Sequence, residues 1–246
     1  MIKRNSFTIL LAILFMLLSG AIYFIHYFIF RDIRHIFIYL VGDLAFLPLQ
    51  VLLVALIIER VMASREQNIK LQKLNIIIGV FFAEIGNELL HDILQYVHNR
   101  EEISKNLNIN ASWTKRDFQK AVEFSNHLML DVDSGIDLVR LKKFLSAKRV
   151  FLLTLLENPS LLEHDRFTDL LWAVTHLDEE LEARPMIDNC SGTDLLHIIG
   201  DIRRMYGHLS SEWLDYSEHL KLKYPYLFSL LVRTHPFQEH PSPFVM

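Results

Sequence analysis

The sequence is poor in the residues that interrupt or cross-link a chain. Its 246 residues include only eight glycines, seven prolines and one cysteine, Cys190. A single cysteine excludes an intrachain disulfide, so nothing in the sequence requires an oxidising compartment. Few glycines and prolines disfavour a disordered chain and an all-β fold with many turns. Because helix-favouring residues such as Leu, Glu and Lys are frequent, we expect an all-α protein.

The common short motifs of catalysis are also missing. The sequence contains no glycine-rich phosphate loop, no serine nucleophile elbow, and neither an HExxH nor a CxxC motif. Cys190 lies close to Thr193, a predicted helix cap, and a nearby helix N-terminus can lower the pKa of a thiol and make it a nucleophile. A lone cysteine in a cytosolic loop is usually inert, and that interpretation is preferred. We therefore favour a protein without enzymatic activity over an enzyme.

Two long apolar runs lie near the N-terminus of a chain that is 51% hydrophobic. Residues 7–30 carry no charged side chain, and about 20 such residues are enough to cross a bilayer as a helix. A second run covers residues 36–58, and only the short segment RDIRH separates the two. The sequence therefore predicts a transmembrane helical hairpin within residues 1–65. Because the first run continues to Phe30 without a polar cleavage region, an uncleaved anchor is preferred over a signal peptide.

Basic residues predict the orientation of this hairpin. Positively charged side chains gather on the cytoplasmic side of membrane proteins. Six of them flank the outer ends of the two runs, whereas the connecting segment offers two. We expect a multi-pass protein of the inner (cytoplasmic) membrane with both termini in the cytoplasm and the lipid bilayer as its first partner. The six are Lys3, Arg4, Arg60, Arg65, Lys70 and Lys73, and the two are Arg31 and Arg34.

Polar residues inside the predicted spans are candidates for a function. An ionisable side chain exposed to lipid costs several kcal/mol, so it normally has a partner. The candidates are Asp43, His26 and Gln50. The preferred interpretation is structural, with an Asp43–His26 contact or a polar contact between protomers. An ion or proton pathway, which would require an oligomer, is the alternative.

The charge of the remaining chain is negative. Residues 1–65 carry six basic and three acidic side chains, a net of +3, so residues 66–246 carry −7 of the total of −4. An acidic domain repels phosphate groups, and nucleic acid is therefore not an expected partner. We expect an unidentified protein partner instead, and a homodimer through the long helix after Ile58 is a further option.

Apolar periodicity predicts a cytosolic bundle of about six helices over residues 66–234, followed by an irregular, proline-containing tail at 235–246. The stretch LDVDSGID lacks the spacing of a calcium loop and is interpreted as a turn and a helix cap. The expected helices are a long one, or two nearly collinear ones, through residues 59–102, one at 114–129, one at 136–156, one restarting at Asn158 and Pro159 and ending at Pro185, one capped by Thr193, and one from Pro225.

Histidines near carboxylates raise the question of a metal site. Eight of the ten histidines after residue 65 have an Asp or Glu three or four residues away. A di-iron bundle site needs two Glu-x-x-His pairs and two further carboxylates. Glu88 and His91 form one such pair, and Asp194 with His197 is the nearest second copy. Single ligands could come from Glu123, Glu179 or Glu212.

The helical face argues against that site. Glu88 and His91 lie opposite the Leu and Ile stripe of their helix, whereas metal ligands in a bundle project into the core. The preferred interpretation is a solvated face and no cofactor. A membrane-anchored metalloenzyme with iron or manganese bound to Glu88, His91, Asp194 and His197 is the alternative.

Aromatic residues are concentrated near the C-terminus, in KYPYLFSLLVRTHPF. Tyr224, Tyr226, Phe228 and Phe237 either seal the bundle or form an interaction surface for a partner. Sealing the bundle is the preferred interpretation.

Three segments carry a resemblance to a known family. They are IGVFFAEIG from Ile78, ENPSLLEHDRFTDLLWAV from Glu157, and YPYLFSLLVRTHPF from Tyr224. In these segments the chain resembles a family of bacterial two-span membrane proteins to which no function is attached. The resemblance implies a membrane hairpin followed by a helical domain, and it implies no catalytic residues. Together with the composition it favours a membrane-anchored helical domain that acts as a protein-interaction or sensory and regulatory module.

Overall fold

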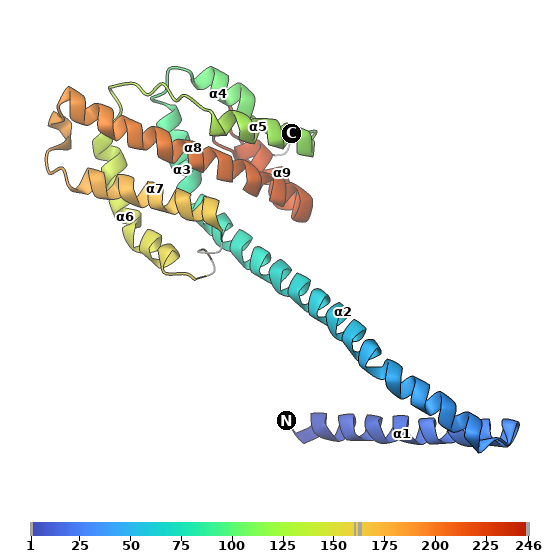
Figure 1. Ribbon diagram of the computed structural model, residues 1–246. Helices are drawn as coiled ribbons and strands as arrows, with labels where there is room; N and C mark the ends of the chain where they lie inside the picture. The colour runs from blue at the N-terminus through green and yellow to red at the C-terminus, as the bar shows by residue number, and fades with distance from the viewer. Residues whose placement is uncertain (1, 160, 162–163, 245–246) are drawn as a thin grey trace. The chain divides into compact units, whose positions relative to one another are not determined.

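The computed structural model describes residues 2–159, 161 and 164–244 (Figure 1). The backbone divides into two compact units, residues 1–67 and 68–246. The all-α prediction is confirmed, since no β-strand occurs within the described ranges and only an isolated antiparallel bridge joins Val97 to Val132.

The first unit contains helix α1 (Ile2–Phe30) and the first part of helix α2 (Ile33–Phe81). Arg31 ends α1 because its φ of 51° is left-handed. Asp32 then starts α2, since its Oδ1 accepts a hydrogen bond of 2.9 Å from the backbone N–H of Arg34. The connection between the two predicted spans is therefore only two residues long.

Polar side chains in this unit do not pair as the sequence predicted. The ring of His26 stacks near those of Phe30 and His35, with centroid separations of 4.7 and 6.1 Å. Asp43 is exposed, and no hydrogen bond or ion pair joins it to His26 in the described part of the chain. The predicted Asp43–His26 contact is therefore wrong within a single chain. At about 1.5 Å per residue, Asp43 lies about 12 Å further along α2 than His35, which already occupies the space beside His26.

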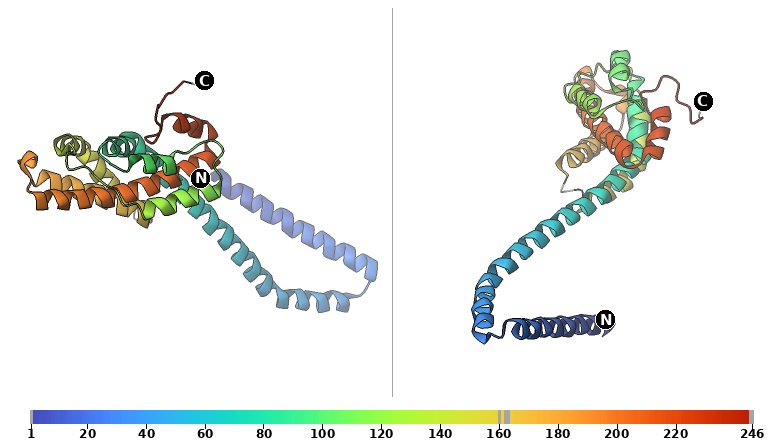
Figure 2. Two further views of the ribbon diagram at one scale, coloured as in Figure 1. Left: turned by 90° about the horizontal axis from the view of Figure 1, so that it is seen from above. Right: turned by 90° about the vertical axis from the view of Figure 1, so that its right-hand side faces the viewer.

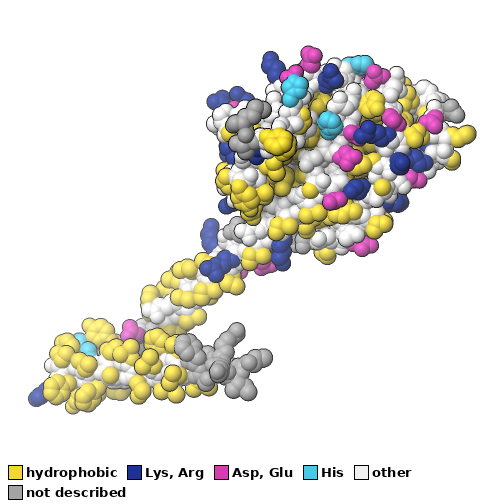
Figure 3. All heavy atoms as spheres, turned by 180° about the vertical axis from the view of Figure 1, so that it is seen from behind, with side chains coloured by type: hydrophobic (Ala, Val, Ile, Leu, Met, Phe, Trp, Pro, Cys, Tyr) yellow, Lys and Arg dark blue, Asp and Glu magenta, His cyan; other side chains and the backbone are white. Residues whose placement is uncertain are grey.

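Apolar side chains cover the first unit. Figure 3 shows them on the visible side of its helices, whereas the helical domain presents acidic, basic and histidine side chains interspersed with apolar ones. By length and composition, the helical stretches Ile9–Phe30 and Ile33–Leu94 are both capable of crossing a membrane. Gln50 is exposed on the same surface.

The second unit begins with the end of α2, which continues into a π-helical turn η1 (Phe82–Gly86) and helix α3 (Asn87–Leu94). The sequence predicted one long helix or two nearly collinear helices here, without a π turn. The π turn is accommodated by Gly86, because a Cβ at this position would collide with the ring of Phe82. Phe81, Phe82 and Ile85 are all buried around this turn. One side of the turn is thus packed into the domain, whereas Ala83 and Glu84 on its other side are exposed.

Helix α8 (Gly192–Lys223) is the centre of the domain (Figures 1 and 2). Its buried residues Ile198, Ile202, Tyr206, Leu209 and Trp213 recur at spacings of three and four, which places them on one helical face. The helices that pack on it are α3, α5 (Lys115–Asn126), α7 (Asp165–Glu182) and α9 (Pro225–Thr234); α6 (Leu138–Leu156) packs on α7 and α4 (Arg100–Leu107) on α5.

Several helix starts follow the predicted local signals. Thr114 caps α5 in a capping box, in which its N–H donates to Asp117 Oδ2 at 2.7 Å. This hydrogen bond, together with one from the hydroxyl of Thr114 to the same oxygen, holds the pKa of Asp117 below its usual range. Asp137 caps α6, as the turn-and-cap interpretation of LDVDSGID required. Pro225 is the first residue of α9.

Other predicted starts are wrong. The predicted restart at Asn158 and Pro159 is a turn, although three residues of that segment, 160 and 162–163, lie outside the described residues. Helix α7 begins at Asp165, because the ring of His164 accepts a hydrogen bond from the N–H of Phe167 at 3.1 Å. Helix α8 begins at Gly192 with Ser191 as its cap in place of Thr193. The described part of the domain has α3 to α9 in addition to the end of α2, more than the six helices expected.

The aromatic C-terminal segment mostly seals the core. Phe228 is buried, and Phe237 is only 2% exposed with its ring 5.0 Å from that of Trp213. These two residues therefore do not form an interaction surface. Tyr224 is half-buried and Tyr226 is 71% exposed, so Tyr226 remains available to a partner. The predicted tail has no regular structure as far as it is described, but its first residues belong to the core.

Candidate functional site

Helices α7 and α8 carry the same short pattern on the faces that meet. On α7, His176 is followed four residues later by Glu180, and on α8, His197 is followed four residues later by Asp201. Side chains four residues apart lie on one side of a helix. The connection between the two helices is short, and the two faces pack against each other. The four side chains form what we call the α7–α8 cluster.

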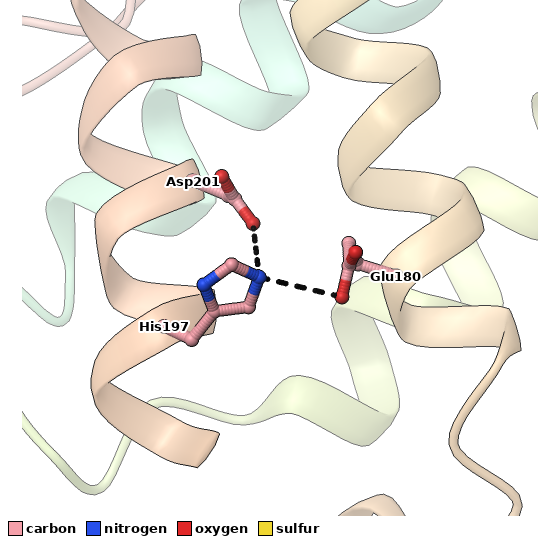
Figure 4. A group of neighbouring side chains, drawn as sticks. All are labelled: Glu180, His197 and Asp201. Carbon is pink, nitrogen blue, oxygen red and sulfur yellow. Dashed lines mark ion pairs between the residues drawn. The ribbon is translucent and has the colours of Figure 1, made fainter. Parts of the chain in front are cut away.

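The nitrogen of one histidine lies between two carboxylates in this cluster. His197 Nε2 is 3.6 Å from Glu180 Oε2 and 3.6 Å from Asp201 Oδ2. Figure 4 shows His197 and Asp201 projecting from one helix toward Glu180 on the facing helix. His176 Nε2 approaches the same two carboxylates, at 3.9 Å from Glu180 Oε1 and 3.6 Å from Asp201 Oδ2. Both helices therefore contribute one imidazole and one carboxylate.

Asp201 is the buried member of the cluster. Its side chain is only 3% exposed, whereas those of His176 and His197 are 44% and 56% exposed. Arg204 Nη2 lies 3.3 Å from its Oδ1. Its Oδ2 is buried and accepts no hydrogen bond. A buried carboxylate oxygen without a donor is costly, so this atom requires a proton or cation from its surroundings.

Arg184 fixes the outer carboxylate of the cluster. Its Nη1 donates to Glu180 Oε2 at 2.6 Å, and its Nε and Nη2 hold both oxygens of Asp194. The hydrogen bond from Arg184 holds the pKa of Glu180 below its usual range, and it lowers the pKa of Asp194 in the same way. Both carboxylates are therefore ionised at neutral pH. The arginine is engaged on two sides and does not neutralise Asp201.

Donor atoms of this kind can hold a metal ion. One ligand atom each from Glu180, His197 and Asp201 lies within 4.8 Å of the others, and these three are the group of that kind found in the described part of the chain. Imidazole nitrogen and carboxylate oxygen are common ligands of divalent transition ions.

The metal residues predicted from the sequence are only partly brought together. His197 joins the α7–α8 cluster, but Asp194 binds Arg184. Glu88 and His91 are exposed on α3, where His91 lines a separate hollow of about 590 Å³ with Phe237. Within the described residues, neither of them shares a ligand group with His197. Glu123, Glu179 and Glu212 do not join that group either.

The sequence did not predict this cluster because two carboxylates lie at helical spacing from His197, and the wrong one was chosen as its partner. Asp194 lies three residues before it and Asp201 four residues after it. Only the tertiary contact with Arg184 removes Asp194 from the choice. A useful signal was the repetition of His-x-x-x-carboxylate in two helices joined by a short connection, at HLDEE and HIIGD.

The structure does not support Cys190 as a nucleophile. Partial burial raises the pKa of its thiol above the ordinary value, and the neighbouring Asp194 carboxylate raises it further. The helix that was expected to lower this pKa begins at Gly192, and the shift found for the thiol has the opposite direction. Cys190 is therefore a thiol at neutral pH.

A second polar group lies on α7 and α8 around Glu212. Its side chain is 3% exposed, and its Oε1 lies 3.1 Å from Arg166 Nε. Arg166 also binds Asp215 and donates to Ser211 Oγ at 2.6 Å. Burial raises the pKa of Glu212 to about 7 despite the arginine. The group borders a hollow of about 360 Å³ that is also lined by Arg203, Arg204 and His208.

Comparison with known proteins matches both parts of the chain. A family model described as "MJ1433, N-terminal helical domain" covers residues 3–62, and one described as "Uncharacterized protein MJ1433, C-terminal helical domain" covers residues 70–233. The chain is 41% identical over 234 residues to the "Uncharacterized protein MJ1433" of Methanocaldococcus jannaschii, which covers 95% of this chain and 94% of that protein. That relative is archaeal, so the bacterial origin implied by the resemblance is not supported. No solved structure matches the chain.

Proposed function

Because the chain belongs to the MJ1433 family, in which an N-terminal helical domain precedes a C-terminal one, we propose that it is a membrane-anchored protein whose cytosolic helical domain acts as a protein-interaction or sensory module. In this proposal α1 and the first part of α2 cross the cytoplasmic membrane. Residues 68–246 then form the cytosolic domain that carries the interaction or sensory function.

The observation that carries this proposal is the exposure of residues 9–67. All of these side chains are exposed except His26 and Ile36, which are half-buried. Soluble monomers rarely expose a contiguous apolar patch larger than about a few hundred Å². Each Å² of apolar surface removed from water is worth about 25 cal/mol, so a surface of this extent requires a cover. Lipid around both helices supplies one, and the run lengths match the bilayer.

Charge supports the proposed orientation. The short segment RDIRH between the two apolar runs offers Arg31 and Arg34, whereas three times as many basic residues flank the outer ends of these runs. The positive-inside preference then places both termini in the cytoplasm. Asp43 and Gln50 would lie within the lipid-facing part of α2, and we expect a polar contact between protomers to satisfy Asp43.

Membrane attachment and orientation can be tested together. Full-length protein carrying a C-terminal green fluorescent or alkaline phosphatase reporter is fractionated after washing the membranes with alkaline carbonate. We expect retention in the membrane fraction, fluorescence from the first fusion and no phosphatase activity from the second. Release by carbonate without detergent, or phosphatase activity outside the membrane, would overturn the proposal.

An exposed apolar surface supports the interaction role. A hollow of about 360 Å³ lies between the end of α2 and the α8–α9 corner, lined by Ile76, Val80 and Leu227 among others. The side chains of Leu222 and Tyr226, which are close in sequence to Leu227, are 70% and 71% exposed. Apolar and aromatic side chains around a hollow are typical of surfaces that bind another protein.

Site-specific crosslinking in intact cells tests this surface. A photoreactive phenylalanine analogue replaces Tyr226, and the matched control carries it at Val150, an equally exposed apolar position on α6. We expect a discrete crosslinked product from position 226 and none from position 150. A product of twice the chain mass identifies a homodimer, and any other discrete product identifies a different protein. The absence of a product specific to position 226 would contradict an interaction role for this surface.

A further inference from the structure

We propose that the α7–α8 cluster binds a divalent first-row transition ion of the zinc type through Glu180, His197 and Asp201, with His176 as a fourth ligand. The site lies entirely on α7 and α8 of the helical domain. The inference therefore does not rest on membrane anchoring.

The spacing of the ligand atoms fits such an ion. Bonds of about 2.0 to 2.2 Å place neighbouring ligands of a tetrahedral ion about 3.3 to 3.6 Å apart. The four nitrogen–oxygen distances in the cluster are 3.6, 3.6, 3.6 and 3.9 Å. All four exceed the length of a direct hydrogen bond, about 2.7 to 3.2 Å. Ligand atoms of Glu180, His197 and Asp201 therefore lie within 4.8 Å of one another without forming hydrogen bonds, and His176, which faces the other oxygen of Glu180, would turn toward them to complete the set.

The buried oxygen of Asp201 is the independent observation that points to a cation. Asp201 Oδ2 accepts no hydrogen bond, and it faces the Nε2 atoms of both histidines. Both nitrogens lie 3.6 Å away, beyond the length of a hydrogen bond, so the histidines leave this oxygen unsatisfied. A divalent ion bound to the two nitrogens and to this oxygen satisfies all three atoms at once.

The neighbouring arginines hold the ligands in position without occupying the site. Arg204 approaches the other oxygen of Asp201, Oδ1, which leaves Oδ2 directed at the histidines. Arg184 donates hydrogen bonds to both Glu180 and Asp194, and these bonds restrain the carboxylate of Glu180. A carboxylate oxygen has two lone pairs, so Glu180 Oε2 can accept from Arg184 and still bind an ion. Outer contacts of this kind orient metal ligands in many proteins.

The donor set selects the class of ion. Two imidazole nitrogens and two carboxylate oxygens suit Zn²⁺, Fe²⁺, Co²⁺ and Ni²⁺, whereas Mg²⁺ and Ca²⁺ prefer oxygen ligands alone. Because the histidines and Glu180 lie at the surface, an ion can enter from solvent. Binding would join α7 to α8 near the connection between them, so the bound ion would hold the two helices together.

Zinc binding to the full-length chain tests the proposal. The protein is purified in mild detergent, treated with a chelator, and titrated with Zn²⁺ by calorimetry and equilibrium dialysis. We expect about one Zn²⁺ per chain and a rise in the thermal unfolding midpoint on binding. His197→Ala and Asp201→Asn each weaken binding by about tenfold or more. Co²⁺ in place of Zn²⁺ gives the intense visible absorption of a tetrahedral site in the wild type, and His197→Ala loses it.

Two control variants make the test specific. The double variant Glu88→Ala, His91→Ala removes the pair predicted from the sequence, and His98→Ala removes a surface histidine 3.8 Å from Asp133. Both controls keep wild-type zinc affinity. His197 is half-exposed, so its replacement leaves the fold intact even if Asp201→Asn does not. No stoichiometric zinc in the wild type, or equal affinity in His197→Ala, overturns the proposal.

Discussion

Neutralising Glu212 should remove a pH dependence of folding. Burial raises the pKa of this carboxyl from its ordinary value of 4.5 to about 7. The folded state thus favours the protonated form, and the contribution to stability is fully present below about pH 4.5 and is lost as the pH rises through about 7. A difference of about 2.5 pKa units corresponds to about 3 kcal/mol in total, of which about 2 to 3 kcal/mol falls between pH 5 and 8. Glu212→Gln is neutral throughout and should lack this loss.

Urea unfolding of the full-length chain in detergent measures the effect. Fluorescence reports on the domain because Trp213, the next residue, is fully buried. The free energy of unfolding is determined at pH 5 and pH 8 for the wild type, for Glu212→Gln, and for the control Asp215→Asn. Asp215 also binds Arg166 but is 40% exposed, so its replacement perturbs the arginine without removing the buried carboxyl. The wild type and the control should lose about 2 to 3 kcal/mol more than Glu212→Gln between the two pH values.

A wild type and a Glu212→Gln variant with parallel pH profiles would refute this reasoning. That result would mean that Arg166, 3.1 Å away, keeps Glu212 ionised in the folded protein at pH 5. The attraction of the ion pair would then exceed the cost of burying the carboxylate.

Three further predictions concern the packing of the domain. Phe237→Ala removes a ring that is 2% exposed against Trp213 and should lower the free energy of unfolding by about 3 to 5 kcal/mol in urea titrations. Gly86→Ala forces a methyl group into the ring of Phe82 and should cost about 1 to 3 kcal/mol, whereas Gly200→Ala, with open space around its Cβ, should stabilise α8 by about 1 kcal/mol. Burial lowers the pKa of His235 to about 4, so the folded state favours the neutral ring. The resulting contribution to the free energy of unfolding is present above about pH 6.5 and is lost as the pH falls through about 4. His235→Phe should remove this pH dependence from urea titrations across that range.

The helices that the sequence predicted well are those with complete local signals. The capping box of Thr114 and Asp117, the cap at Asp137 and the proline at 225 act within one turn of the chain, so the spacing of residues is enough to recognise them. The start of α7 is different. His164 is an unusual cap, and the proline at 159 is a stronger local signal, so the predicted start lay too early.

The π turn and the cluster depend on contacts between distant segments. Gly86 looks like any helical glycine until the ring of Phe82 is placed beside it. Likewise, Glu180 and Asp201 each have a nearby histidine in the sequence, but only the packing of α7 on α8 shows that the two pairs face one another. Sequence periodicity reports the face of a single helix and carries no information on its neighbour.

The central position of α8 has a consequence for synthesis of the protein. Tyr206 donates a hydrogen bond to the carbonyl of Leu90 at 3.5 Å across 116 residues of sequence. At about 5 to 20 residues per second, a ribosome would need about 6 to 23 s to make the intervening chain. During that interval α3 lacks the helix against which it packs, while the apolar N-terminal helices have already emerged. We expect nascent chains that end before α8 to be sensitive to proteases and to recruit chaperones.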